Sequence, residues 1–376
     1  MSCLVIKNDG IGDLILASGI ISQLGEYFRG DLDLVTCEQN REIAEMIPNV
    51  RRVFYVSRDD LHFSDRLWKW GVLSGRGSKA DRIVLRQIRG ECYDTAISLR
   101  RFIRQNTLVI MRSVRAKKRY CAWQLPTNAT SQLATRASKG WSHYRGPIDT
   151  LWEPAYYQSF LEREMGLEIN PHPSLRFAHS TAASRYNKAV ALGISGSSAR
   201  WADENWLQTA RLLAQGGWKI GLFGGRDSSA LANRICESVE CVNEVGNLSF
   251  SDTASRLQEY PFYIGNDTGL SHLASLVVKK VLIIYGGGTF RRFFPWETAT
   301  NQHVIYKGLD CFDCTWSCKH PERYCLTSLK SNDVVQFFDE IVAGTAPVER
   351  DLNSKNETYV TAWQILEGGK KINIRT

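Results

Sequence analysis

The sequence begins MSCLVIKNDGIGDLILASGIISQLGEYFRGDLDLV over residues 1–35, and this stretch decides the fold. A short apolar run at 4–6 leads into a loop with two glycines, a longer apolar stretch follows at 14–28, and a second short run occupies 32–35. This order predicts strand, helix and strand, which is the repeating unit of a parallel sheet covered by helices on both faces.

The same rhythm continues along the chain with one interruption. Residues 58–90 are charged and contain tryptophan and glycine, and we interpret them as an insertion near a cleft. A polar segment at 171–187 has the composition of an interdomain linker. The other expected elements are helices at 43–46, 152–165, 204–215, 228–238 and 332–342, and strands at 53–56, 94–99, 189–194, 219–223, 262–264 and 281–285.

The length of the chain indicates more than one domain. A chain of 376 residues is too long for one ordinary core and suits two domains. The expected fold class is α/β, with two Rossmann-like domains whose parallel sheets face each other across a cleft. Their expected bounds are 1–180 and 188–345, followed by a tail at 346–376. Hydrophobic residues make up 43% of the sequence, which excludes a disordered chain.

Composition also bears on location and partners. The amino terminus lacks the features of an export signal, and no apolar run approaches the roughly 18 residues of a membrane-spanning helix. We expect a cytoplasmic protein whose only membrane contact is peripheral, at the inner face. The net charge is +8, with a basic surplus between Arg100 and Arg119. That surplus suits an anionic acceptor, a lipid surface or a solvated face; nucleic acid is disfavoured because no aromatic stacking pattern accompanies it.

The loop after the first strand, Asn8 to Asp13, is the first candidate site. Gly10 and Gly12 permit a tight turn at a helix amino terminus. A dinucleotide site would have a small residue where Ile15 stands, so NAD binding is disfavoured. Asp13 lies where open α/β sheets bind ligands, and we expect it to act as a general base. The structural alternative is that Asp13 only caps the helix.

A second candidate site follows the strand at 262–264. Amide groups at Thr268, Gly269 and Leu270 open an apolar helix and are expected to bind phosphate. Asp267 would repel phosphate and is expected to accept hydrogen bonds from sugar hydroxyls. His272 has two interpretations that the sequence leaves open, a phosphate donor or a core histidine.

Further loops follow neighbouring strands of the second half. Ser195, Ser197 and Ser198 with the guanidinium of Arg200 suit a diphosphate leaving group. Gly225 follows the next strand and is expected near the nucleoside.

Four of the ten cysteines are clustered. Cys311, Cys314, Cys318 and Cys325 are separated by two, three and six residues, which suits one tetrahedral thiolate site for zinc or iron. The expected role of the metal is structural, and catalysis is expected to need no cofactor. The alternative is a group of reduced thiols, with or without one disulfide.

The run Gly-Asn-Asp-Thr-Gly-Leu-Ser-His-Leu-Ala at 265–274 resembles the signature of the ADP-heptose:lipopolysaccharide heptosyltransferase family, glycosyltransferase family 9. The loop at Gly12 and Asp13 is similar to the amino-terminal motif of that family. Weaker matches occur in the family's order at 223–225, 246–249 and 285–289 and at the cysteine pair Cys311 and Cys314, so the resemblance covers about residues 1–342.

The resemblance implies a GT-B fold and an inverting transfer of heptose from ADP-heptose to an acceptor hydroxyl. The acceptor would be a lipopolysaccharide core or a related bacterial glycan, and the alternatives are a protein such as an autotransporter, or no catalysis at all in a nucleotide-sugar-binding protein. Asp13 would deprotonate the acceptor, and Leu248 would lie against the adenine. One departure is Ala199, which stands where family members usually carry lysine, and Arg200 is expected to replace that charge.

Overall fold

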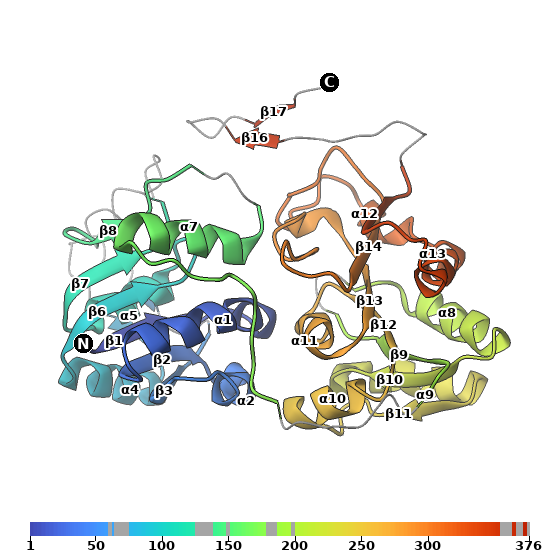
Figure 1. Ribbon diagram of the computed structural model, residues 1–376, viewed down its shortest axis with the longest axis horizontal. Coiled ribbons are helices and arrows are strands. Elements are labelled where there is room, and N and C mark those ends of the chain that lie inside the picture. Colours follow the sequence, from blue (N-terminus) through green and yellow to red (C-terminus); the bar gives the residue numbers. More distant parts are fainter. Residues whose placement is uncertain are drawn as a thin grey trace. The chain divides into compact units, whose positions relative to one another are not determined.

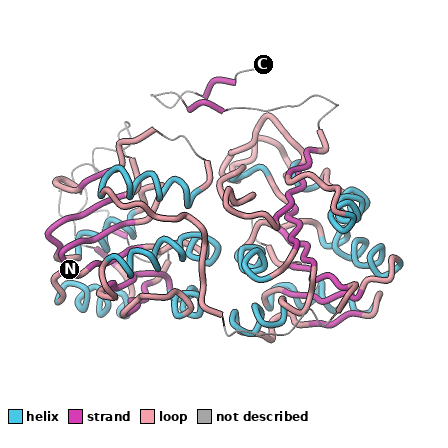
Figure 2. Tube along the Cα trace, in the orientation of Figure 1, coloured by secondary structure: helices cyan, strands magenta, loops and turns pink. Residues whose placement is uncertain are grey.

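The computed structural model describes residues 1–58, 62–63, 75–124, 138–147, 151–177, 186–196, 200–353, 363–365 and 371–373. The chain divides into two compact units, Met1–Arg176 and Phe177–Thr376. Each unit contains its own parallel sheet with helices, so the α/β fold expected from the sequence is confirmed. Figure 1 labels the elements, and Figure 2 separates helices from strands by colour.

The sheet of the first unit has six parallel strands in the order β3-β2-β1-β6-β7-β8. The chain moves outward from β1 to β3 and then returns to the other side of β1 with β6. The point at which the strand order reverses therefore lies between β1 and β6, and such switch points are where open sheets bind ligands. The strands are β1 (Cys3–Ile6), β2 (Leu32–Cys37), β3 (Arg52–Val56), β6 (Tyr93–Ser98), β7 (Ala116–Cys121) and β8 (Ser142–His143).

Helices of the first unit pack in pairs. The contacts join α1 to α7 and α4 to α5, and α4 also packs on β3. The strands β1 and β2 are buried along their whole length, which explains the continuous apolar run of β1. The buried Asp33 of β2 is paired with Arg51 and Arg52. The helices are α1 (Ile11–Tyr27), α2 (Arg41–Glu45), α4 (Lys79–Gly90), α5 (Gln105–Ser113) and α7 (Glu153–Met165), and the short strands β4 (His62–Phe63) and β5 (Gly75–Arg76) form a separate antiparallel pair.

The sheet of the second unit has seven parallel strands in the order β11-β10-β9-β12-β13-β14-β15. Its order reverses between β9 and β12, so this unit repeats the plan of the first. The strands are β9 (Ala189–Gly193), β10 (Lys219–Phe223), β11 (Cys241–Asn243), β12 (Phe262–Asn266), β13 (Lys280–Ile284), β14 (Gln302–Tyr306) and β15 (Glu349–Asp351).

One apolar core joins the sheet of the second unit to its helices. Trp201 and Trp206 are fully buried in it and pack edge to face. The helices are α8 (Asp203–Gln215), α9 (Ser229–Ser238), α10 (Phe250–Leu257), α11 (Gly269–Val277), α12 (Tyr324–Thr327) and α13 (Ser331–Ala343). Within the described ranges, none of the helices combines the length and apolar character needed to cross a membrane.

Two expectations about segment boundaries differ from the structure. The expected insertion at 58–90 includes α4, which packs on β3 and connects the two halves of the first sheet, so its second part belongs to the core fold. Residues 59–61 and 64–74 of that segment lie outside the described residues. The expected tail at 346–376 includes β15, which pairs with β14 at Val304–Glu349 and extends the second sheet, and the hairpin strands β16 (Trp363–Ile365) and β17 (Lys371–Asn373).

Candidate functional site

Asp13 lies in the first turn of α1, at the carboxyl end of β1. The N-cap of α1 is Gly10 and Asp13 is the third residue of the helix, a position from which a carboxylate can also stabilise the helix terminus, so the structure leaves both interpretations of Asp13 open. Its carboxylate lies over the loop, because a Cβ added at Gly10 would come within 3.2 Å of Asp13 Oδ2. The positive end of the helix favours the ionised carboxylate. Gly12 precedes Asp13 in the same turn, and both are half-buried.

A buried charge network underlies this loop. Lys7 directly follows β1 and is 0% exposed. Its Nζ donates to Glu153 Oε1 at 3.0 Å and to the Tyr157 hydroxyl at 2.9 Å, and it lies 2.9 Å from Asp9 Oδ2. The Tyr157 hydroxyl also donates to Glu153. Burial alone would lower the pKa of Lys7, but the surrounding acidic groups, Asp13 among them, raise it well above its ordinary value. Lys7 is therefore a fully charged buried cation.

The network crosses the switch point of the first sheet. Arg100 follows β6, and one of its nitrogens lies 2.6 Å from Asp9 Oδ1 while another donates to the Asn8 carbonyl at 3.1 Å. The Asn8 side-chain oxygen accepts from the Thr107 hydroxyl at 3.0 Å. These contacts tie the loop after β1 to the segment after β6 and hold the backbone that leads to Asp13.

The basic stretch from Arg100 to Arg119 is divided between a loop, α5 and β7. Several of its charges have partners within the unit: Arg101 donates to the Leu151 carbonyl at 2.8 Å, and Lys117 binds Asp94 at 2.7 Å. Arg119 donates to the Val114 carbonyl at 2.6 Å. The basic residues from Arg100 to Arg119 therefore do not form one continuous basic face on a single helix or strand.

The second unit brings three predicted loops together at the carboxyl edge of its sheet. The Ser195 hydroxyl, after β9, accepts from the Gly225 amide at 3.1 Å, after β10. The Asn266 side chain, at the end of β12, donates to the Ser195 carbonyl at 2.7 Å. The loop before α10 joins them, because the Gly246 amide donates to the Gly224 carbonyl at 2.9 Å. Leu248, in that loop, is half-buried and presents an apolar surface.

The amino terminus of α11 lies at the same edge. Thr268 is its N-cap, and its side chain makes no capping hydrogen bond. Thr268 Oγ1 is buried without a hydrogen-bond partner among the described residues, as is Asn266 Oδ1. Amides in the first turn of a helix have no intrahelical acceptor. The site therefore offers several donors, and one of them is a buried hydroxyl, to an anion or a hydroxylated ligand.

Asp267 is held beside this helix terminus. Its Oδ2 accepts from the Thr289 hydroxyl at 3.3 Å, and its side chain is 7% exposed. Thr289 lies in the glycine-rich loop after β13. The carboxylate is thus fixed next to the positive end of α11, where it remains able to accept hydrogen bonds from a hydroxylated ligand.

His272 is buried at 2% exposure, which favours the core interpretation over the phosphate donor. Its ring stacks on Phe294 at 4.2 Å between centroids, and its Nδ1 accepts from Trp296 Nε1 at 3.2 Å. An accepting Nδ1 places the proton on Nε2, which lies 4.0 Å from Asp267 Oδ1. The histidine therefore supports Asp267 from inside the protein.

The guanidinium of Arg200 already forms an ion pair with Asp203. Its Nε and one terminal nitrogen donate to Asp203 Oδ1 at 3.1 and 2.8 Å, at the start of α8. An anionic ligand would have to compete with Asp203 for this charge. Ser197 and Ser198, which were expected beside it, lie outside the described residues.

The four clustered cysteines line one small cavity with His320. All four carry free thiols. Burial raises the pKa of Cys325 first, and the nearby thiols of Cys318, Cys311 and Cys314 add to that rise. The group of possible metal ligands found among the described residues is a mixed one, formed by Asp310, Cys311 and His320, whose ligand atoms lie within 4.8 Å of one another. The sequence analysis missed Asp310 and His320 because it considered only thiolates.

The remaining cysteines include one disulfide. Cys236, at the end of α9, is bonded to Cys241, at the start of β11. The sequence analysis expected any disulfide within the cluster, and it gave no reason to pair these two.

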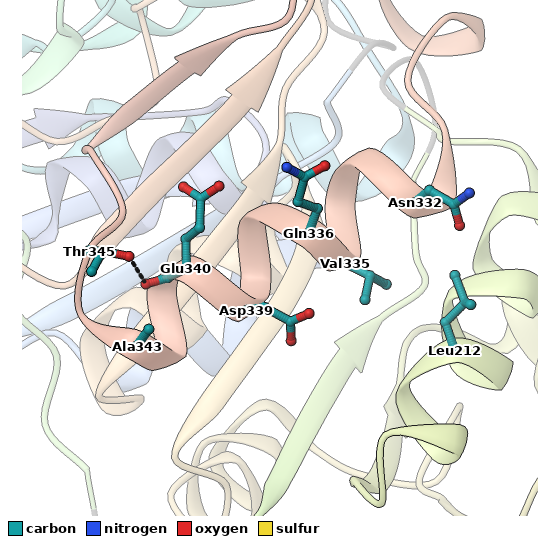
Figure 3. A pocket seen from close by; sticks show the side chains of 8 residues that line it. All are labelled: Leu212, Asn332, Val335, Gln336, Asp339, Glu340, Ala343 and Thr345. Atoms are coloured by element: carbon teal, nitrogen blue, oxygen red, sulfur yellow. Dashed lines mark hydrogen bonds between the residues drawn. The ribbon is translucent and has the colours of Figure 1, made fainter.

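A separate hollow lies between α8 and α13 (Figure 3). Its lining includes Asp339 and Glu340, and Glu340 forms an ion pair with Arg350. Carboxylates would repel a diphosphate, and none of the predicted site residues lines this hollow. The carboxyl edge of the sheet, described above, is the better candidate for a nucleotide site.

Sequence reasoning missed the supporting residues of both sites. Lys7, Asp9 and Glu153 carry the network beneath Asp13, and Thr289 holds Asp267. A lysine directly after a fully apolar strand was the available signal for the first site. Glu153 gave none, because it lies 146 residues away from Lys7 in the chain.

Comparison with known proteins agrees with this arrangement. Residues 161–320 match the model of glycosyltransferase family 9 (heptosyltransferase). The chain is 28% identical over 148 residues to lipooligosaccharide heptosyltransferase 2 of Campylobacter jejuni, covering 38% of this chain and 46% of that relative. It is 23% identical to lipopolysaccharide heptosyltransferase 1 of Escherichia coli K12, covering 76% of this chain and 88% of the relative. The match to the Campylobacter relative thus spans about half of that protein's length.

Solved structures show the same fold. A glycosyltransferase family 9 protein from Veillonella parvula superposes with a TM-score of 0.68 at 15% identity, covering 91% of this chain and 97% of that one. E. coli heptosyltransferase WaaC with ADP-2-deoxy-2-fluoro heptose gives 0.62 at 19% identity, covering 91% and 100%. The iron-containing dodecameric glycosyltransferase TibC of enterotoxigenic E. coli gives 0.54 at 10% identity, covering 91% and 76%. The chain thus has the fold of the solved glycosyltransferase family 9 proteins, and its residues 161–320 match the model of that family, the heptosyltransferase family.

Proposed function

We propose that the protein is a glycosyltransferase that moves a heptose from ADP-heptose to a hydroxyl of a lipopolysaccharide core or related bacterial glycan, with inversion at the anomeric carbon. The observation that carries this proposal is the group of three loops and one helix terminus at the carboxyl edge of the second sheet. There the buried Thr268 Oγ1 lacks a protein partner among the described residues, and Ser195 and Gly225 are held together beside it.

In this scheme the second unit binds the donor. The amides of Thr268, Gly269 and Leu270 hold the diphosphate at the positive end of α11. Asp267 accepts hydrogen bonds from the sugar hydroxyls, and Leu248 packs against the base. Arg200 contributes to diphosphate binding only to the extent that it leaves Asp203.

The first unit activates the acceptor. The oxygen of the acceptor hydroxyl forms a bond to the anomeric carbon while its proton passes to the Asp13 carboxylate. The bond between the anomeric carbon and the phosphate oxygen breaks, and ADP leaves with that electron pair. No metal or cofactor is required in this scheme, because the helix amides carry the growing negative charge.

The acceptor is proposed from two observations. The curated relatives reported above are lipooligosaccharide and lipopolysaccharide heptosyltransferases. The net charge of the chain is +8, which suits an anionic acceptor. A cytoplasmic location with at most peripheral membrane contact fits eight cysteines that carry free thiols, whereas the Cys236–Cys241 disulfide does not add support.

The test uses the full chain with ADP-heptose and a heptose-deficient core lipid. We expect the lipid to gain the mass of one heptosyl residue, with no gain for the Asp13→Asn variant over the same period. A parallel reaction offers a bacterial surface protein as acceptor. Mass gain only on the protein would replace the glycan acceptor, and no transfer to either would contradict the transferase function.

The donor base is tested by calorimetry with ADP, UDP and GDP. We expect ADP to bind tightest. The half-buried Leu248 provides an apolar surface on which adenine can pack, and it makes no hydrogen bond to the base. A preference for UDP or GDP would contradict ADP-heptose as the donor while leaving glycosyl transfer in place.

We also propose a structural zinc or iron ion at the cysteine cavity. Thiolates with one imidazole are ligands that both metals accept, and Cys311 and His320 already lie within binding distance of a shared ion. Elemental analysis of the purified protein is expected to give about one equivalent of metal, which the Cys311→Ser and Cys314→Ser double variant should lose. Metal retained by that variant would contradict the site.

A further inference from the structure

Several charged side chains are buried beneath the loop that leads to Asp13. The groups that contact Lys7 are Asp9 from the loop after β1 and Glu153 and Tyr157 from α7. The charge of Asp13, in the first turn of α1, also acts on Lys7. Arg100, from the segment after β6, binds Asp9 from the other side. Burial and its partners raise the pKa of Tyr157 well above its ordinary value, so this hydroxyl remains neutral. The charged members are therefore two cations and three carboxylates.

Glu153 is the member whose presence the fold explains least. It is the first residue of α7 and is 1% exposed. A carboxylate there suits the helix terminus, but an exposed one would do so without the cost of removing a charge from water. Its Oε1 instead accepts from Lys7 Nζ at 3.0 Å and from the Tyr157 hydroxyl, so the carboxylate serves the lysine.

If Glu153 were absent, the charge of Lys7 would lower the proton affinity of the Asp13 carboxylate. A buried cation close to a carboxylate stabilises its ionised form and lowers its affinity for a proton. A general base needs that affinity, because proton transfer slows as the base becomes weaker. The negative charge of Glu153 opposes the charge of Lys7 and so preserves the basicity of Asp13, while Lys7 still fixes the loop.

We propose that Glu153 is a positioning residue that acts through Lys7 to keep Asp13 an effective proton acceptor. This inference rests on the proposed function, in which Asp13 removes the proton of the acceptor hydroxyl. It adds to that function a residue on a distant helix, which touches neither substrate nor the reacting atoms.

The test is the pH dependence of kcat/KM for the acceptor at saturating ADP-heptose, measured for the full chain and for Glu153→Gln. Glutamine keeps an Oε1 acceptor for both hydrogen bonds and removes only the charge. We expect the acidic limb of the profile to move down by about 0.5 to 1 pH unit, since Lys7 is then less compensated. We also expect the plateau to fall by about 2- to 5-fold because the base is weaker.

A second variant predicts the opposite direction. Arg100→Gln removes a positive charge that binds Asp9, so the acidic limb should move up. Arg100→Gln tests whether charge in this cluster moves the limb, since it leaves Glu153 in place. Glu153→Asp keeps the charge and should leave the limb in place, so it tests the role of Glu153 if Glu153→Gln does not fold. Folding is checked by circular dichroism and thermal unfolding of the full chain, because both variants lie in the first unit. ADP affinity, proposed for the second unit, should stay within about twofold, a difference below 0.5 kcal/mol.

Two controls separate charge from structure. Tyr157→Phe removes two hydrogen bonds and no charge, so the limb should stay in place even if the plateau falls. Glu204→Gln removes an exposed carboxylate on α8 and should change neither. A limb that stays in place in both Glu153→Gln and Arg100→Gln, or that moves equally in Tyr157→Phe, overturns the inference. Absence of transfer by the unaltered protein would instead contradict the proposed function.

Discussion

The two sheets reverse their strand order in the same way, but the residues at the two switch points differ in kind. In the first unit, Lys7, Asp9 and Arg100 bind one another across β1 and β6. In the second unit, the segments after β9 and β12 are joined by neutral hydrogen bonds, such as that from the Asn266 side chain to the Ser195 carbonyl. Each switch point keeps buried polar atoms without a partner among the described residues: Asn8 Nδ2 and Ser98 Oγ in the first, and Asn266 Oδ1 and Thr268 Oγ1 in the second.

This difference suggests that the switch points of the two sheets have different roles, although the strand order is the same. In the proposed function, the ion pairs of the first switch point hold the segment that leads to Asp13, the proposed base. The buried Thr268 hydroxyl at the second switch point would gain a hydrogen bond when the proposed donor binds. The same topology would then serve proton transfer in one unit and donor binding in the other.

The largest expected effect is on stability. Lys7→Met should lower the free energy of unfolding by about 3 kcal/mol, because Asp9 and Glu153 lose their buried cation. The folded pKa of Lys7 lies above its unfolded value of 10.5, so this stabilisation is complete below pH 10.5 and is lost as the pH rises through the folded pKa. Urea unfolding of both proteins at pH 7 and 9 should give equal differences. A difference in the free energy of unfolding below about 1 kcal/mol would contradict a stabilising role for the buried network around Lys7.

The next effect is on turnover. Asp13→Asn should reduce kcat by about 100-fold or more, the usual scale for loss of a general base. ADP affinity should remain within about twofold, since Asp13 belongs to the first unit. Rapid-quench transfer assays and calorimetry measure the two quantities. Weakened ADP binding with unchanged turnover would contradict the proposal that the first sheet carries the base and the second sheet binds the donor.

A smaller effect is expected at the neutral switch point. Thr268→Val removes the buried hydroxyl that lacks a partner and should weaken ADP binding by about 5- to 10-fold, or roughly 1 kcal/mol. Without ADP the melting temperature should stay the same or rise, because an unsatisfied buried group is lost. Calorimetry and thermal unfolding test both parts. A fall in stability of the ADP-free protein would mean that the hydroxyl has an internal role and would weaken the comparison.

The smallest effect is expected at Arg200. Its guanidinium binds Asp203, so Arg200→Ala should change ADP affinity by less than about threefold. Asp203→Asn is the matched variant, because it releases the guanidinium and should strengthen ADP binding. A loss of tenfold or more in Arg200→Ala would show that the arginine turns to the diphosphate when ADP binds.

The parts of the fold that the sequence predicted share one property, a continuous buried run. The strands β1, β9 and β10 were expected within one residue of their observed bounds, because buried parallel strands are apolar throughout. β7 was missed because its sequence AKKRYC is dominated by charges that face away from the core. β15 was missed for the same reason, and α4 was missed because it was placed within an insertion.

The candidate site was predictable where loops follow strands and not where contacts are long-range. The positions of Ser195, Gly225 and Thr268 follow from the rule that parallel strands end at one edge. The pairing of Lys7 with Glu153 depends on where α7 packs, so no local pattern encodes it. Arg200 and Asp203 are neighbours in the chain, so their pairing was available from the sequence and was overlooked. His272 was left open because burial alone distinguishes its two interpretations.

The short strand β15 has a practical consequence. It lies at the outer end of the second sheet, and all three of its residues, Glu349, Arg350 and Asp351, are charged. Charged residues on an outer strand discourage the backbone from pairing with another molecule. A recombinant chain shortened to residue 345 would expose β14, which is buried along its whole length, and such a fragment should self-associate at concentrations at which the longer chain stays dispersed.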